Sequence, residues 1–171
     1  MQLGDHSNDR TERSLVAVAL DQLNADFSEL LDVVESGGLD QLAAAEKVAW
    51  WQRFESFRNR LPLLDHQMIT DAEATDLAGS YSFSSLARLL TRILQLSPGE
   101  AAARVRAAAA VGPRTSMLGE RLEPVLPRLA ALQREGAVSA EKVQIVERAI
   151  AKALSYWTES GGGADRRRTA H

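Results

Sequence analysis

Two stretches in the first half of the chain place apolar residues alternately four and three positions apart. This spacing puts every member of a stretch on one side of an α-helix. The first set is Val16, Leu20, Leu23, Phe27, Leu30 and Val34. The second set is Trp50, Phe54, Phe57, Leu61, Leu64 and Met68. Gly37 and Gly38 lie between the two sets and can close the last turn of a helix. The pattern therefore predicts an antiparallel helical hairpin.

Pro62 lies inside the second set, where it removes one backbone hydrogen bond. We expect either a kink there or two helices in series. Thr70 with Glu73 resembles the start of a separate short helical segment that reaches Leu77. A polar break at 79–82 follows, so the sequence predicts an acidic helical hairpin over residues 1–78.

The rest of the chain predicts four further helices. They cover 83–95, 98–111, about 125–135 and about 140–157. The second of these has a clear start, because Ser97 can cap it, Pro98 suits its first position and Glu100 completes a capping box. A looser segment with Gly119 precedes the third helix. In the last helix we expect Val143, Ile145, Val146, Ile150 and Leu154 to be buried.

The composition agrees with helices, because the chain is rich in alanine and leucine and poor in β-branched runs. We predict an all-α protein in which the N-terminal hairpin is followed by a compact helical bundle. The bundle is expected over 79–158 and contains a helix-turn-helix-like unit over 83–111. Residues 159–171, with three glycines and then three arginines, are expected to form a flexible tail.

Charge is distributed unevenly along the chain. Residues 1–78 hold fifteen acidic and six basic residues, a net charge of −9, whereas residues 79–171 hold eight and fourteen, a net charge of +6. Residues 88–134 contain eight arginines, three acidic residues and no lysine. Arginine favours planar, bidentate contacts such as those with phosphate. The alternative interpretation is a set of solvated helix faces.

Few residues offer catalytic chemistry. The chain has no cysteine, which excludes disulfides, thiolate metal sites and a cysteine nucleophile. His66 stands beside Asp65, but no spacing supplies about four zinc ligands, and the acidic set Asp71, Glu73 and Asp76 lacks a calcium-loop pattern. No serine lies in a glycine-flanked nucleophile elbow. We therefore predict no catalytic residue, no metal and no cofactor.

The sequence also predicts a protein that does not enter membranes. No stretch approaches the roughly 20 apolar residues of a membrane span. Acidic residues stand where a secretory signal would be positive. We expect a cytoplasmic protein without a membrane partner.

Aromatic residues of the hairpin suggest an interaction seam made of Phe27, Trp50, Trp51 and Phe54. Adjacent helical residues point about 100° apart, so only one of the two tryptophans can lie at the centre of the stripe. Packing between helices is one interpretation of the seam. Self-association of the chain through its N-terminal helices is the other.

The unit over 83–111 is a candidate for nucleic-acid binding, although a plain helical hairpin has the same pattern. Arg88 and Arg92 lie one turn apart on its first helix. The second helix begins with a glycine, a glutamate and three alanines, and alanine has no donor or acceptor for base edges. Arg104 and Arg106 come later and would meet phosphates. Any binding should therefore be dominated by charge and shape.

The run SLARLLTRILQLSPGEAAARV at 85–105 resembles the actinobacterial family called domain of unknown function 222, which includes the mycobacterial thirteen-E-twelve repeat proteins. The similarity continues through GPR at 112–114, LGE at 118–120 and GAVS at 136–139. Proteins of this family commonly carry an HNH endonuclease module after the helical domain. The resemblance implies that the helical part binds DNA or organises the protein.

These observations lead to two hypotheses. The first is a non-catalytic DNA-associating accessory domain of an HNH-endonuclease-type protein, with the nuclease module absent from this chain. Its phosphate contacts are predicted to be Arg88, Arg92, Arg104, Arg106 and Arg114. The second is a helical interaction or oligomerisation scaffold with no nucleic-acid role, in which the acidic and basic regions neutralise each other.

Overall fold

The computed structural model describes the backbone of residues 6–116 and 118–162 and the side chains of 15–116 and 118–157. The predicted all-α class is confirmed, with one small two-stranded sheet added to the helices. The chain divides into two compact units, residues 1–51 and 52–171. Each unit is described by itself.

The N-terminal unit is built on α1 (His6–Val33), which continues into the π-helical turn η1 (Val34–Gly38). Gly37 has φ +90°, the left-handed conformation that glycine adopts without strain. The predicted helix and its glycine stop are therefore confirmed. The unit ends within the next helix, α2 (Ala44–Arg60).

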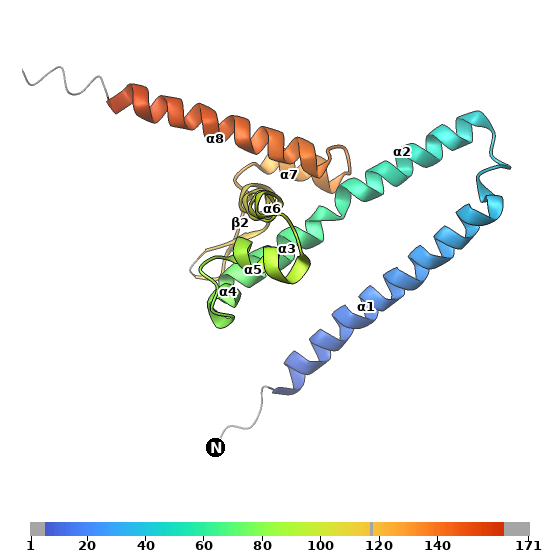
Figure 1. The fold of residues 1–171 in the computed structure, drawn as a ribbon, viewed down its shortest axis with the longest axis horizontal. Coiled ribbons are helices and arrows are strands. Elements are labelled where there is room, and N and C mark those ends of the chain that lie inside the picture. The colour runs from blue at the N-terminus through green and yellow to red at the C-terminus, as the bar shows by residue number, and fades with distance from the viewer. Residues whose placement is uncertain (1–5, 117, 163–171) are drawn as a thin grey trace, which may run out of the picture. The chain divides into compact units, whose positions relative to one another are not determined.

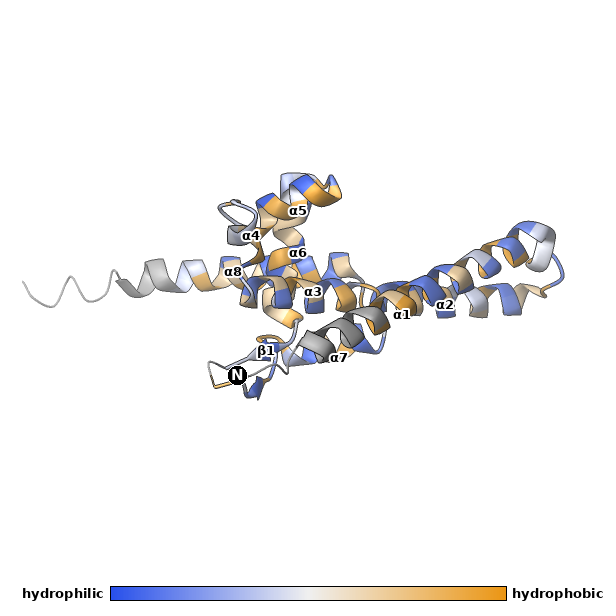
Figure 2. Cartoon of the chain, turned by 90° about the horizontal axis from the view of Figure 1, so that it is seen from below, coloured by the Kyte–Doolittle hydropathy of each residue, from blue (hydrophilic) through white to orange (hydrophobic). Residues whose placement is uncertain are grey.

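The apolar set of α1 is exposed, whereas the sequence predicted that it packs in a hairpin. Leu20 is 56% and Phe27 is 46% exposed. Figure 2 shows hydrophobic and hydrophilic residues interspersed along α1 and α2. The spacing of apolar residues determines which of them share a helix face. It does not determine whether another element covers that face.

Pro62 separates two helices in series, one of the two arrangements expected. It occupies the first turn of α3 (Pro62–Ala74), where its missing N–H costs nothing. The expected start at Thr70 is wrong, because α3 continues through that residue. The next helix, α4 (Leu77–Ser80), is instead capped by Asp76, whose carboxylate accepts a hydrogen bond from the Gly79 amide at 3.2 Å.

The division after Trp51 differs from the junction expected after residue 78. The physical reason is that α3 packs closely against α6 (Pro98–Val111) and so belongs to the C-terminal unit. Ile69 and Ala72 of α3 are buried in its core. A polar stretch and a change of charge sign therefore did not mark a boundary between compact units.

Helices α5 (Leu86–Leu94) and α6 begin at serine caps. The Ser85 hydroxyl accepts from the Arg88 amide, and the Ser97 hydroxyl accepts from the Glu100 amide at 3.1 Å. Each hydroxyl satisfies an amide that the first helical turn leaves free. The start predicted from Ser97 is confirmed.

Helix α6 is the central helix of the C-terminal unit (Figure 1). Its residue Ala108 joins a core cluster with α3, α4 and α5. Ala107, Ala110 and Val111 join a second cluster with Val143 of α8 (Ala140–Gly162). Partly buried residues of α7 (Pro127–Arg134) cover that second cluster. The small alanine side chains let neighbouring helices pack on opposite sides of α6.

A short hairpin interrupts the helices after α6. Strands β1 (Arg114–Thr115) and β2 (Arg121–Leu122) pair antiparallel, with Gly119 at φ +82° in the turn. The sequence predicted only a looser segment here. Strands of two residues are too short to produce a readable alternation of polar and apolar residues.

Helix α8 is less buried than expected. Val143 is fully buried, but Ile145 is 50% and Leu154 is 62% exposed, and Val146 and Ile150 are also exposed. The helix runs to Gly162, so residues 159–162 of the predicted tail are helical. Residues 163–171 of that tail lie outside the described part of the chain.

The turn before α8 packs closely on α2. Gly136 has φ +78°, and its carbonyl accepts a hydrogen bond from the Asn59 side chain at 2.9 Å. A Cβ at this position would collide with the Ser56 backbone. The glycine therefore provides both the left-handed backbone and the space for this contact.

Substitutions on two sides of α6 should have different effects on stability. Ala108→Leu should reduce the free energy of unfolding by about 1–3 kcal/mol, because the larger side chain overfills the core cluster. Ala109→Leu is the control, since Ala109 is exposed one position further along the same helix. Chemical denaturation of both variants measures the difference. Equal stability losses would contradict the central position of α6.

Candidate nucleic-acid interface

Arg88 and Arg92 lie on the exposed side of α5. The same helix buries Leu86 and Leu89 in the core, so its polar positions are left to solvent. Among the described side chains, neither arginine forms an ion pair with a carboxylate. Both therefore keep a positive charge available to an anionic partner.

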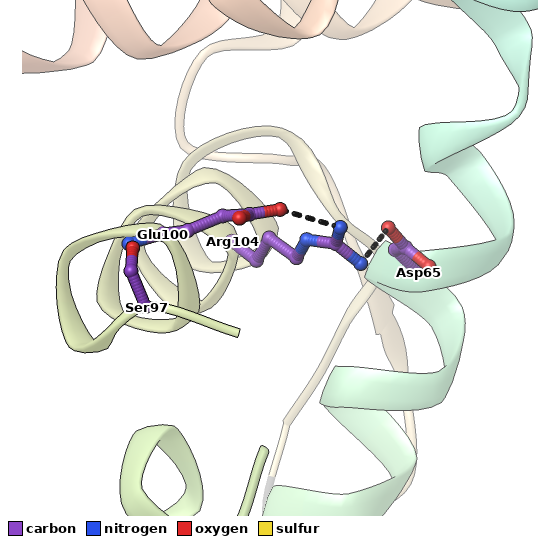
Figure 3. A network of polar contacts seen from close by, with 4 residues as sticks. All are labelled: Asp65, Ser97, Glu100 and Arg104. Atoms are coloured by element: carbon purple, nitrogen blue, oxygen red, sulfur yellow. Dashed lines mark hydrogen bonds and ion pairs between the residues drawn. The ribbon is translucent and has the colours of Figure 1, made fainter. Parts of the chain in front are cut away.

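Arg104 is held between two carboxylates, as Figure 3 shows. Its Nη1 lies 3.3 Å from Asp65 Oδ2 on α3, and its Nη2 lies 2.7 Å from Glu100 Oε1 on α6. Two acidic groups thus compensate the guanidinium charge. This geometry links α3 to α6 and removes Arg104 from the free cations that the sequence prediction grouped as phosphate contacts.

Arg106 is also paired. Its Nε lies 3.4 Å from Glu147 Oε2 on α8, and that glutamate side chain is only 16% exposed. The half-buried carboxylate is a stronger partner for the guanidinium than an exposed one, because water screens it less. Arg106 therefore connects α6 to α8 and is not a free phosphate ligand in this structure.

Arg114 donates a hydrogen bond to the backbone carbonyl of Glu123 at 3.3 Å, across the hairpin. This bond orients the guanidinium without compensating its charge. Arg114 shares a cavity of about 570 Å³ with Arg121 of β2 and Arg134 of α7. We call this cavity the arginine pocket. Walls from α3, the end of α6, the hairpin and α7 form it.

The sequence interpretation did not select Arg121 and Arg134 as site residues. Both belong to the group of eight arginines, so the charge count included them. Nothing in the linear pattern indicated that they lie beside Arg114, because the hairpin that brings Arg121 back was not predicted. The close association of these residues depends on tertiary structure.

The proposed helix-turn-helix-like pair has an unexpected arrangement. Helices α5 and α6 pack together as expected, with a turn at 95–97 between them. However, α6 is also covered by α3, α7 and α8. A recognition helix needs a free face for a DNA groove. Here the exposed positions of α6 are its first turn, 98–100, and Arg106 and Ala109, and the rest of the helix is buried or partly buried.

His66 and Gln133 form a buried polar pair beside the arginine pocket. His66 Nε2 lies 3.0 Å from Gln133 Oε1, and both side chains are almost completely buried. Burial lowers the pKa of His66 below its ordinary value of 6.5, although the bond to Gln133 and the charge of Asp65 act in the opposite direction. His66 is therefore neutral near pH 7.

Residues of the predicted interaction seam differ in exposure. Trp51 is 71% exposed and Phe27 is also exposed, whereas Trp50 and Phe54 are partly buried. The Phe54 ring contacts the Phe57 ring at a centroid distance of 6.4 Å. The seam thus contains both surface and packed aromatic side chains.

Two other kinds of feature are absent from the described residues. Their His, Asp and Glu side chains form no group of three or more placed to hold a metal ion. In the same part of the chain, no helix is both long and apolar enough to cross a membrane.

Comparison with known sequences places the chain in a family. A model described as "Domain of unknown function (DUF222)" matches residues 48–160. The chain belongs to this family. The match begins within α2 and contains the C-terminal unit up to residue 160. The resemblance inferred from residues 85–105 is therefore confirmed.

Several mycobacterial proteins are similar to this domain of unknown function 222 chain. Uncharacterized protein Rv1702cMb1728c of Mycobacterium tuberculosis strain H37Rv is 33% identical over 140 residues, which cover 80% of this chain and 29% of that protein. Uncharacterized protein Mb1179c of Mycobacterium bovis is 32% identical over 153 residues, 87% of this chain and 32% of that protein. The chain thus spans about a third of these relatives. No solved structure matches it significantly.

The buried histidine should make stability depend on pH. Below pH 6.5 the unfolded chain binds a proton at His66 that the folded chain resists, so the free energy of unfolding should fall as the pH is lowered through 6.5. His66→Gln should remove this part of the slope. Chemical denaturation from about pH 7.5 to 5.5 tests it. Identical slopes for both proteins would contradict the assignment.

Proposed function

We propose that the chain is a non-catalytic DNA-associating domain that binds through charge and shape. The observation that carries this proposal is the set of arginines in 88–134 that form no ion pair with a carboxylate among the described side chains. They are Arg88, Arg92, Arg114, Arg121, Arg128 and Arg134. All six are exposed. Exposed guanidinium groups favour bidentate contacts with phosphate.

The arrangement of these arginines favours contacts with the DNA backbone over contacts with base edges. The first helix of the pair offers Arg88 and Arg92, while the alanine-rich second helix lies in the core. Phosphate contacts fix the position of a protein on DNA but carry no direct sequence information. We therefore expect binding that is sensitive to salt and tolerant of sequence.

The proposal places this domain within a longer protein that carries an HNH endonuclease module. Family resemblance supports that architecture, and the relatives extend well beyond the matched segment. In such a protein the nuclease module would supply catalysis and this domain would hold DNA. Localisation in the cytoplasm is part of the same proposal.

Fluorescence anisotropy of the full chain with a labelled 5′-hydroxyl duplex tests DNA association. Binding should weaken as salt rises, and Arg88→Ala/Arg92→Ala should reduce the slope of log affinity against log salt by about 1.8, because each lost phosphate contact contributes about 0.9. Arg106→Ala is the matched control and should leave the slope unchanged, since Glu147 already pairs with Arg106. No binding at low salt would contradict the proposal.

A helical scaffold is the second candidate function, and the exposed apolar residues on one face of α1 favour it. A row of apolar side chains on one helix face is typical of a surface that contacts another helix. In this interpretation the exposed Leu20 and Phe27 mediate self-association.

Sedimentation equilibrium of the full chain tests this second candidate. The scaffold interpretation expects a mass that rises with protein concentration, and a return to the monomer mass in Phe27→Asp because a buried carboxylate opposes association. Phe27→Leu, which keeps an apolar side chain, is the control. A protein that stays monomeric at high concentration would exclude self-association through this seam.

A further inference from the structure

The arginine pocket joins residues that are distant in sequence. Arg114 and Arg121 come from the two strands of the hairpin, and Arg134 comes from the last turn of α7. Its volume of about 570 Å³ lies within the range of small-molecule sites, about 300–1,000 Å³. Three arginines that line one cavity are a suitable arrangement for an anion.

The charge of the lining indicates which anion fits. The three arginines are opposed by one carboxylate, that of Glu123, and His66 is neutral near pH 7. The net charge of the lining is therefore +2. A phosphate monoester carries about −1.5 to −2 at pH 7. A single carboxylate group would leave part of the positive charge uncompensated.

The remaining lining indicates what the phosphate is attached to. Much of the wall is apolar, and it includes Val111, Leu122, Pro124 and Ala130. Apolar walls with a few placed polar groups are typical of sites that bind an organic molecule. The pocket is thus larger and more apolar than inorganic phosphate requires.

We propose that the arginine pocket binds a phosphate monoester of nucleotide size. The phosphate would lie against the arginines, and the organic part would cover the apolar wall. Two sources share this chemistry: a free nucleotide and the 5′-phosphorylated end of a DNA strand. The proposal does not depend on duplex binding through Arg88 and Arg92, which lie outside this pocket.

Isothermal titration calorimetry of the full chain with adenosine 5′-monophosphate tests the site. Arg121→Ala/Arg134→Ala should weaken binding by about tenfold or more, because each substitution removes a charge-assisted hydrogen bond. Arg128→Ala is the matched control and should bind as the wild type does, since Arg128 is exposed on α7 but does not line the pocket. Adenosine, which lacks the phosphate, should not bind.

A second experiment distinguishes the two sources. Anisotropy compares 5′-phosphorylated and 5′-hydroxyl single strands of one sequence. Tighter binding of the phosphorylated strand, lost in Arg121→Ala/Arg134→Ala, assigns the pocket to a strand end. Nucleotide binding without that preference assigns it to a free nucleotide. The proposal is overturned if neither ligand binds in a way that depends on Arg121 and Arg134, even where the 5′-hydroxyl duplex still binds.

Circular dichroism of the variants completes the design. All three substituted arginines are exposed, so their replacement should leave the thermal unfolding transition within a few degrees of the wild type. A loss of binding in a folded variant then reports on the pocket itself. Equal losses of adenosine 5′-monophosphate binding in Arg128→Ala and in Arg121→Ala/Arg134→Ala would overturn the proposal, because they would indicate nonspecific attraction.

Discussion

Close packing on the alanine face of α6 is the constraint on which the C-terminal unit depends. Alanine side chains end at Cβ, so α3 and α8 can approach the backbone of this helix from different sides. The approach brings Asp65 to Arg104 and Glu147 to Arg106. Both ion pairs join a neighbouring helix to α6. The same packing thus builds the core and removes two arginines from the available positive surface.

This partition of the arginines decides which functions the unit can support. Two of the eight arginines in 88–134 form ion pairs that link helices, while the other six form no ion pair with a carboxylate among the described side chains. Of those that remain, two lie on α5, three line the arginine pocket, and Arg128 is exposed on α7 outside the pocket. Surface charge of this kind favours phosphate contacts. The alanine side chains of α6, in contrast, are packed in the core clusters.

The charge asymmetry of the sequence is smaller across the division into units than across the boundary expected after residue 78, but it has the same sign. Residues 1–51 hold ten acidic and three basic residues, a net charge of −7, and residues 52–171 have a net charge of +4. The acidic unit also contains the exposed apolar residues of α1. An acidic, apolar-striped helix and a basic helical core are therefore distinct parts of the chain, with separate candidate roles.

The sequence by itself determined most of the helices, the serine cap at Ser97, the glycine stop at Gly37 and the break at Pro62, because each depends on residues a few positions apart. It also identified the family and the concentration of arginine. Tertiary structure alone decided that α6 is central, that Arg104 is paired and that Arg121 and Arg134 share a cavity. Linear patterns specify which side chains are charged or apolar. They do not specify which distant residue neutralises a charge or covers an apolar face, because that depends on how the helices pack.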